Sequence, residues 1–135
     1  MTPKRIQQRL ADFEKALSRL ELVLQEDPAK TDAIIDATIQ RFEFTFELAW
    51  KLTRDVLLYN GIEVDHPRAV IKEAFQKKFF EEGDAWIQML EDRNKTSHIY
   101  DEREALQIYD KIKKNYCHLL ENLKVKISPM VKKMQ

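Results

Sequence analysis

The sequence is poor in the residues that interrupt helices, since its 135 residues include only two glycines and four prolines. These residues fall between segments with helical periodicity, and no segment of useful length alternates polar and apolar residues as a strand does. Gly61 and Gly83 follow two periodic segments, where a helix often needs a left-handed residue. The sequence therefore predicts an all-α protein.

Cysteine and long apolar runs are also scarce. The single cysteine, Cys117, excludes a disulfide within the chain, and its place in a helical pattern predicts a packed thiol. No run approaches the roughly 18 apolar residues of a membrane span, and the first residues have no apolar signal segment. We therefore expect a cytoplasmic protein with no membrane contact.

No charge of one sign dominates, because 23 basic residues balance 23 acidic ones. Binding to nucleic acid would thus need a local basic patch. The lysine-rich segment from Lys111 onward is either a solvated helix face with a loose tail or a cationic rim for a phosphate-bearing partner. A glycine-rich phosphate loop is absent, so the chain is not itself expected to be a nucleotidyltransferase or an ATPase. The three histidines are scattered, and we expect neither metal nor cofactor.

Apolar residues at steps of three and four predict five helices. They should begin near Thr2, Thr31, Pro67, Asp84 and Asp101, four of which are typical N-cap residues. Asp101 and Glu104 are spaced as a capping box. Short connections favour an up-and-down four- or five-helix bundle. We expect one domain over residues 1–135, with a loose tail from about residue 126.

The segment of residues 31–60 has two apolar stripes. One includes Phe42 and Phe46, which we interpret as core together with Trp50 and Trp86. The other includes Phe44, Leu48 and Leu52. Two stripes predict a central helix that is covered on two sides, with part of it facing a second subunit.

An arginine stands where the fourth helix should be apolar. Trp86, Leu90 and Arg93 are separated by four and three residues, so Arg93 shares the inward stripe. An unpaired buried guanidinium would cost several kcal/mol, so Arg93 needs an acidic partner or a wet cleft. Asn94 shares a neighbouring face with His98, which we expect on the last turn or the following loop.

Arginine and histidine together suit metal-independent RNA cleavage. A neutral imidazole accepts the ribose 2′-OH proton, and a guanidinium binds the phosphate. Asn94 could orient either group, and the acid could be the same His98 of a second subunit across a two-fold axis. The alternative is structural: Arg93 pairs with Glu43, Glu47 or another acid, and His98 is favoured by the dipole at a helix C-terminus.

The stretch "RNKTSHIYDE" resembles the motif of the HEPN family, an Arg and a polar residue followed by a His. Tyr100 resembles the tyrosine of the R-x4-H-x-Y variant in toxin members. "RFEFTFELAWKLTRDVL", "PRAVIKEAF" and "WIQMLEDRNKTSHIYDE" are similar to the branch named nucleotidyltransferase substrate-binding protein. The resemblance covers roughly residues 5–125.

This resemblance implies a homodimeric helical bundle in which two Arg–His motifs line one cleft. It implies a ribonuclease toxin with Arg93 and His98 as catalytic residues, and a minimal nucleotidyltransferase as partner. The partner would transfer AMP to Tyr100 and so silence the cleft. The alternative within the same branch is a non-catalytic subunit that presents a substrate or nucleotide to the nucleotidyltransferase.

Overall fold

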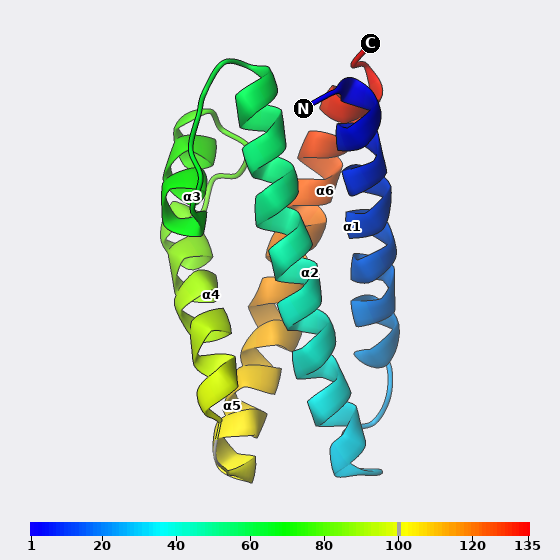
Figure 1. The fold of residues 1–135 in the computed structure, drawn as a ribbon. Coiled ribbons are helices and arrows are strands. Elements are labelled where there is room, and N and C mark those ends of the chain that lie inside the picture. Colours follow the sequence, from blue (N-terminus) through cyan, green and yellow to red (C-terminus); the bar gives the residue numbers. More distant parts are fainter. Residues whose placement is uncertain (100) are drawn as a thin grey trace.

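The computed structural model describes residues 1–99 and 101–135, and every regular element in these ranges is helical. This confirms the predicted all-α fold. The α-helices are α1 (Pro3–Val23), α2 (Asp32–Tyr59), α3 (Pro67–Gln76), α4 (Gly83–Lys95), α5 (Glu102–Lys111) and α6 (Cys117–Lys132) (Figure 1). A 3-10 turn covers Thr96–His98, and a π-helical turn covers Ile112–Tyr116.

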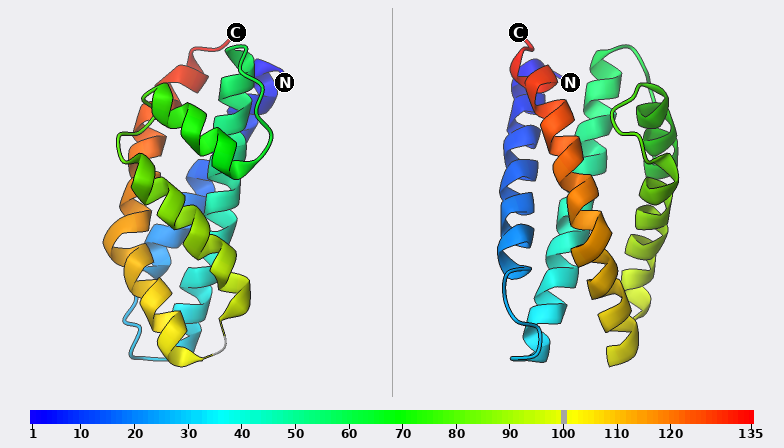
Figure 2. Two further views of the ribbon diagram at one scale, coloured as in Figure 1. Left: turned by 90° about the vertical axis from the view of Figure 1, so that its left-hand side faces the viewer. Right: turned by 180° about the vertical axis from the view of Figure 1, so that it is seen from behind.

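The long helices form the predicted up-and-down bundle, with α2 at its centre. α2 runs opposite to α1 and contacts α1, α3, α4, α5 and α6 (Figure 1). α5, the π-helical turn and α6 continue as one rod behind α2, so the last predicted helix is present but locally widened (Figure 2). The short α3 lies beside the upper part of α2 and α4. Each helix therefore covers part of a single core.

Side-chain caps set the helix starts where the sequence predicted them. Thr2 Oγ1 accepts a hydrogen bond from the Arg5 backbone N–H at 3.3 Å, and Asp101 Oδ1 accepts one from Glu104 at 2.8 Å. His66 Nδ1 accepts one from Ala69 at 3.4 Å, and Pro67 follows it in the first turn of α3. These bonds satisfy backbone donors that have no partner inside the helix.

The two glycines have different roles. Gly61 follows α2 with a φ of 84°, as predicted for a residue after a helix. The same expectation for Gly83 is wrong, because Gly83 is the first residue of α4 and the left-handed residue after α3 is Lys78, with a φ of 62°. A Cβ on Gly83 would lie 2.9 Å from Phe75 Cδ1. Glycine is needed there for close packing.

Aromatic rings fill the centre of the core. Phe42 and Tyr116 stack with centroids 5.7 Å apart, Phe46 lies 6.2 Å from Trp86, and Phe80 stacks on Trp86 at 4.5 Å. Phe42, Phe46, Trp50 and Trp86 are all buried, which confirms that they belong to the core. These rings join α2 to α4 and to the π-helical turn.

The second apolar stripe of α2 is only partly covered within the chain. Leu52 is fully buried, and Leu48 is half-buried, but the Phe44 side chain is 61% exposed. Within the chain, α1 and α2 leave a groove at the level of Phe44, so the expectation that part of this stripe faces a second subunit stays a prediction.

The expected loose tail from about residue 126 is wrong. α6 continues to Lys132, and Ile127 and Val131 are fully buried. Their spacing of four places both on one face, while the lysines of the segment point outward. Gln7 Nε2 donates to the carbonyl of Met134 at 3.1 Å, which ties the end of the chain to α1. Among the described residues, no helix is long and apolar enough to cross a membrane.

Two carboxyl groups meet where α1 packs against α6. Burial raises the pKa of Glu21 above its ordinary 4.5, and the neighbouring Glu121 raises it further. Lys124 Nζ lies 3.1 Å from Glu121 Oε1 and offsets part of this repulsion. Burial, with the same two acids, also raises the pKa of the Cys117 thiol to about 11, so this cysteine is a poor nucleophile at neutral pH.

Glu21→Gln should stabilise the fold at pH 7. The folded-state pKa of Glu21 lies above its unfolded value, so folding disfavours the carboxylate, and this penalty disappears as the pH falls below about 4.5. Urea unfolding at pH 7 and pH 4 measures the difference. Glu26→Gln, at an exposed position, is the control. An equal gain for both variants, or a gain that persists at pH 4, contradicts the expectation.

Candidate functional site

The inward stripe of α4 ends in Arg93, as the sequence predicted. Trp86 and Leu90 are buried, and Arg93 follows them with its side chain 33% exposed. The stripe thus passes from the dry core to the lower end of the bundle, where α4 gives way to the 3-10 turn (Figure 1). About a third of the Arg93 side chain therefore remains open to solvent.

Arg93 has an acidic neighbour on α2. Its Nη2 lies 3.5 Å from Glu47 Oε2, and Glu47 Oε1 in turn lies 3.4 Å from Lys51 Nζ. The Arg93 Nε is buried without a hydrogen-bond partner among the described residues. An ion pair this exposed is worth at most about 1 kcal/mol. The predicted pairing with Glu47 is therefore present, but an anionic ligand could displace it at small cost.

A threonine ties the end of α4 to α2. Thr96 Oγ1 lies 2.7 Å from Glu43 Oε2 and 2.6 Å from the Arg93 carbonyl oxygen. Because a hydroxyl carries one hydrogen, it donates to either acceptor in turn. This contact holds the turn between Arg93 and His98 against the central helix.

His98 is the last residue of the 3-10 turn, directly after α4, where the sequence analysis expected it. Its side chain is exposed, as is that of Asn94 one turn earlier. Ile99, directly after His98, packs against the core and anchors the turn. Tyr100, the predicted AMP acceptor, lies outside the described residues.

Asp92 is a buried acid that the sequence analysis missed. It is 1% exposed, accepts a hydrogen bond from the Tyr116 hydroxyl and lies 3.1 Å from Lys111 Nζ. Burial and the Asp92 carboxylate both raise the pKa of Tyr116. Asp92 lies three residues after the buried Met89, and this spacing was the signal that could have found it.

The Asp92 contacts explain how Arg93 is held. Tyr116 lies in the π-helical turn, and such turns are common near functional sites. Asp92 fastens one face of α4 to this turn, and the next residue, Arg93, lies roughly 100° further around the helix, where it contacts α2. The described residues contain no group of three or more His, Cys, Asp or Glu side chains placed to hold a metal ion.

Asp92→Ala should destabilise the bundle. The change leaves the buried Tyr116 hydroxyl without its acceptor, which costs about 1–3 kcal/mol of the free energy of unfolding in urea. Asp92→Ala combined with Tyr116→Phe should lose less than the sum of the two single changes. Glu91→Ala, at the adjacent exposed position, is the control and should cost at most about 1 kcal/mol. Strict additivity of the two changes would show that the contact contributes nothing.

Comparison with known proteins places the chain in a family. The family model described as nucleotidyltransferase substrate binding protein like matches residues 8–128. The probable ribonuclease HepT of Haemophilus influenzae is 31% identical over 86 residues, which are 60% of this chain and 59% of that protein. The chain thus matches less than two thirds of the length of that relative.

Solved structures have the same fold. A protein from Thermus thermophilus is 34% identical, with a TM-score of 0.78 over 85% of this chain and 98% of that one. A tri-AMPylated HEPN toxin of Shewanella oneidensis, solved with its MNT antitoxin, has a TM-score of 0.74 at 16% identity, covering 92% of this chain and 96% of that one. A Haemophilus influenzae protein described as a substrate binding domain of a nucleotidyltransferase has a TM-score of 0.67 at 21% identity, covering 94% and 99%.

The last two similarities show the fold alone, whereas the family model spans nearly the whole of the chain. The structural similarities agree with the helical bundle described above. The chain therefore belongs to the family of nucleotidyltransferase substrate binding protein-like chains, with the helical fold of a HEPN toxin.

Proposed function

We propose that the chain is a metal-independent ribonuclease toxin of a toxin–antitoxin pair. The observation that carries the proposal is the presentation of Arg93 and His98 at one end of α4, the first half-enclosed and the second exposed. Similarity to the probable ribonuclease HepT and to the fold of a HEPN toxin supports it.

In this mechanism Arg93 binds the scissile phosphate, which replaces the weakly held Glu47. The His98 imidazole takes the proton of the ribose 2′-OH, and the 2′-oxygen attacks phosphorus. The bond from phosphorus to the 5′-oxygen breaks, and that oxygen takes a proton from the His98 of a two-fold related copy. The products are a 2′,3′-cyclic phosphate and a 5′-hydroxyl. Asn94 orients the reacting groups.

The partner in this proposal is a minimal nucleotidyltransferase, and Tyr100 is its target. The Tyr100 phenol oxygen attacks the α-phosphorus of ATP, and pyrophosphate leaves. The attached AMP brings negative charge and bulk beside Arg93 and His98, which excludes an RNA phosphate. The AMP groups on the Shewanella oneidensis toxin support this form of control.

A second candidate is a non-catalytic subunit that presents a substrate or a nucleotide to the nucleotidyltransferase. It is favoured by the acids beside the motif, since Glu47 pairs with Arg93 and Glu43 accepts from Thr96. Carboxylates at this position repel RNA phosphates. The description of the family model names a substrate-binding role.

His98→Ala separates the two candidates. Loss of a general base typically lowers the rate about 10²- to 10⁴-fold, so wild type should arrest growth and produce RNA ends with 2′,3′-cyclic phosphate while the variant does neither. His118→Ala, at another exposed histidine, should behave as wild type. Harmless expression of wild type and both variants, without new RNA ends, would reject the nuclease and favour the presenting subunit.

Tyr100→Phe tests the control by AMP. With the partner nucleotidyltransferase and ATP present, wild type should gain mass in AMP units and lose ribonuclease activity, while Tyr100→Phe keeps its mass and remains active. Tyr59→Phe, at an exposed tyrosine near the end of α2, should be modified and silenced as wild type is. Intact-protein mass spectrometry reads the outcome, and AMP transfer to Tyr100→Phe would assign the acceptor elsewhere.

A further inference from the structure

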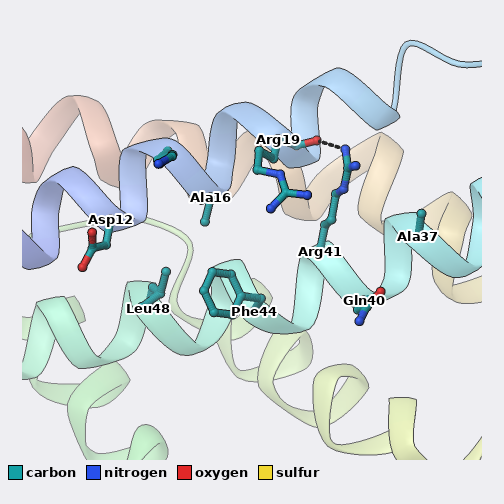
Figure 3. A pocket seen from close by; sticks show the side chains of 9 residues that line it. Asp12, Ala16, Arg19, Ala37, Gln40, Arg41, Phe44 and Leu48 are labelled. Carbon is teal, nitrogen blue, oxygen red and sulfur yellow. Dashed lines mark hydrogen bonds between the residues drawn. The ribbon is translucent and has the colours of Figure 1, made fainter.

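A groove of about 610 Å³ lies between α1 and α2, on the side of α2 away from α4 (Figure 3). This volume is in the range of sites that take a small ligand or a short segment of a polymer. Apolar and cationic side chains line the groove together. The apolar ones are Ala16, Ala37, Phe44 and Leu48, and the cationic ones are Lys15, Arg19 and Arg41.

The three cations are available to an anion. Arg41 Nη1 donates to the Arg19 carbonyl oxygen at 2.8 Å, which fixes its guanidinium across one end of the groove (Figure 3). None of the ion pairs between described residues includes Lys15, Arg19 or Arg41. Asp12 supplies the carboxylate of the lining and accepts a bond from Gln8. In a chain of zero net charge, the groove is a local excess of positive charge.

Phe44 adds an aromatic face to these cations. Its side chain is 61% exposed, although burial of an aromatic ring usually stabilises a fold. Figure 3 shows Arg19 reaching from α1 toward α2, where the Phe44 ring lies. An exposed ring beside cations without acidic partners is the arrangement by which proteins bind single-stranded nucleic acid, with a base on the ring and phosphates on the cations.

The groove and the candidate site both include residues of α2. Phe44 directly follows Glu43, which accepts from Thr96, and Leu48 directly follows Glu47, which pairs with Arg93. Consecutive residues are roughly 100° apart around a helix, so the two sites lie on adjoining faces of α2. A single strand bound in the groove could cross α2 and reach Arg93.

We propose that this groove binds the single-stranded RNA that flanks the cleaved bond, with a base stacked on Phe44 and phosphates on Arg19 and Arg41. The proposal rests on the ribonuclease function. The cations favour RNA over an apolar protein segment, since desolvating them beneath a partner without matching acids is costly. The groove would hold the substrate, while Arg93 and His98 act on it.

The test measures binding of a fluorescent 12-nucleotide single-stranded RNA to the His98→Ala protein, which does not cut it. Adding Phe44→Ala should weaken binding at least about fivefold, the loss of one stacked base. Adding Arg19→Gln or Arg41→Gln should each make the negative slope of log affinity against log salt shallower by about 0.7. Tyr59→Ala and Arg5→Gln, an exposed aromatic on α2 and an exposed arginine on α1, should change neither value.

The outcomes separate this proposal from the function on which it rests. If wild type cuts RNA and the groove variants bind it as the controls do, the groove proposal is wrong and the nuclease stands. If the groove variants instead lose the nucleotidyltransferase or the second copy on size-exclusion chromatography, the groove is a protein interface. If wild type neither binds nor cuts RNA, both proposals fail together.

Discussion

The hydrogen bond from the Tyr116 hydroxyl to the buried Asp92 carboxylate sets the orientation of α4 on which the candidate site depends. A buried carboxylate needs hydrogen-bond donors, and here Tyr116 and Lys111 both donate to Asp92 Oδ2. The donors come from the rod formed by α5, the π-helical turn and α6. Because Asp92 contacts that rod, the helical geometry of α4 directs the next residue, Arg93, toward Glu47 on α2.

The second constraint on the structure is α2, because this helix contacts every other α-helix and contributes residues to the core, the motif and the groove. Its inner face supplies Phe42 and Phe46 to the aromatic core, and its flank supplies Glu43 and Glu47 to the motif. The remaining stripe presents Phe44 to the groove against α1. One helix cannot bury all three of these faces within the chain. Phe44 lies on the face that remains exposed.

The sequence was a good guide to local structure and a poorer guide to burial. Thr2 and Asp101 cap helices as expected, because capping depends on residues a few positions apart. Gly83 and the segment after residue 126 were misread, because their conformations depend on contacts with distant residues. Phe75 packs against Gly83, and the core accepts Ile127 and Val131. The spacing of Asp92 after Met89 indicates burial, but its partners Lys111 and Tyr116 lie on other elements and are set by the tertiary structure.

The sequence by itself determined the helical class, the helix starts, the family resemblance and the place of Arg93 on an inward stripe. These properties follow from periodicity and capping, which act within one or two turns. Only the tertiary structure decided that Arg93 meets Glu47, that Asp92 is buried beside Tyr116, and that Phe44 stays exposed in a cationic groove. Those contacts join residues far apart in the chain, and their partners are selected by packing between helices, which no local pattern records.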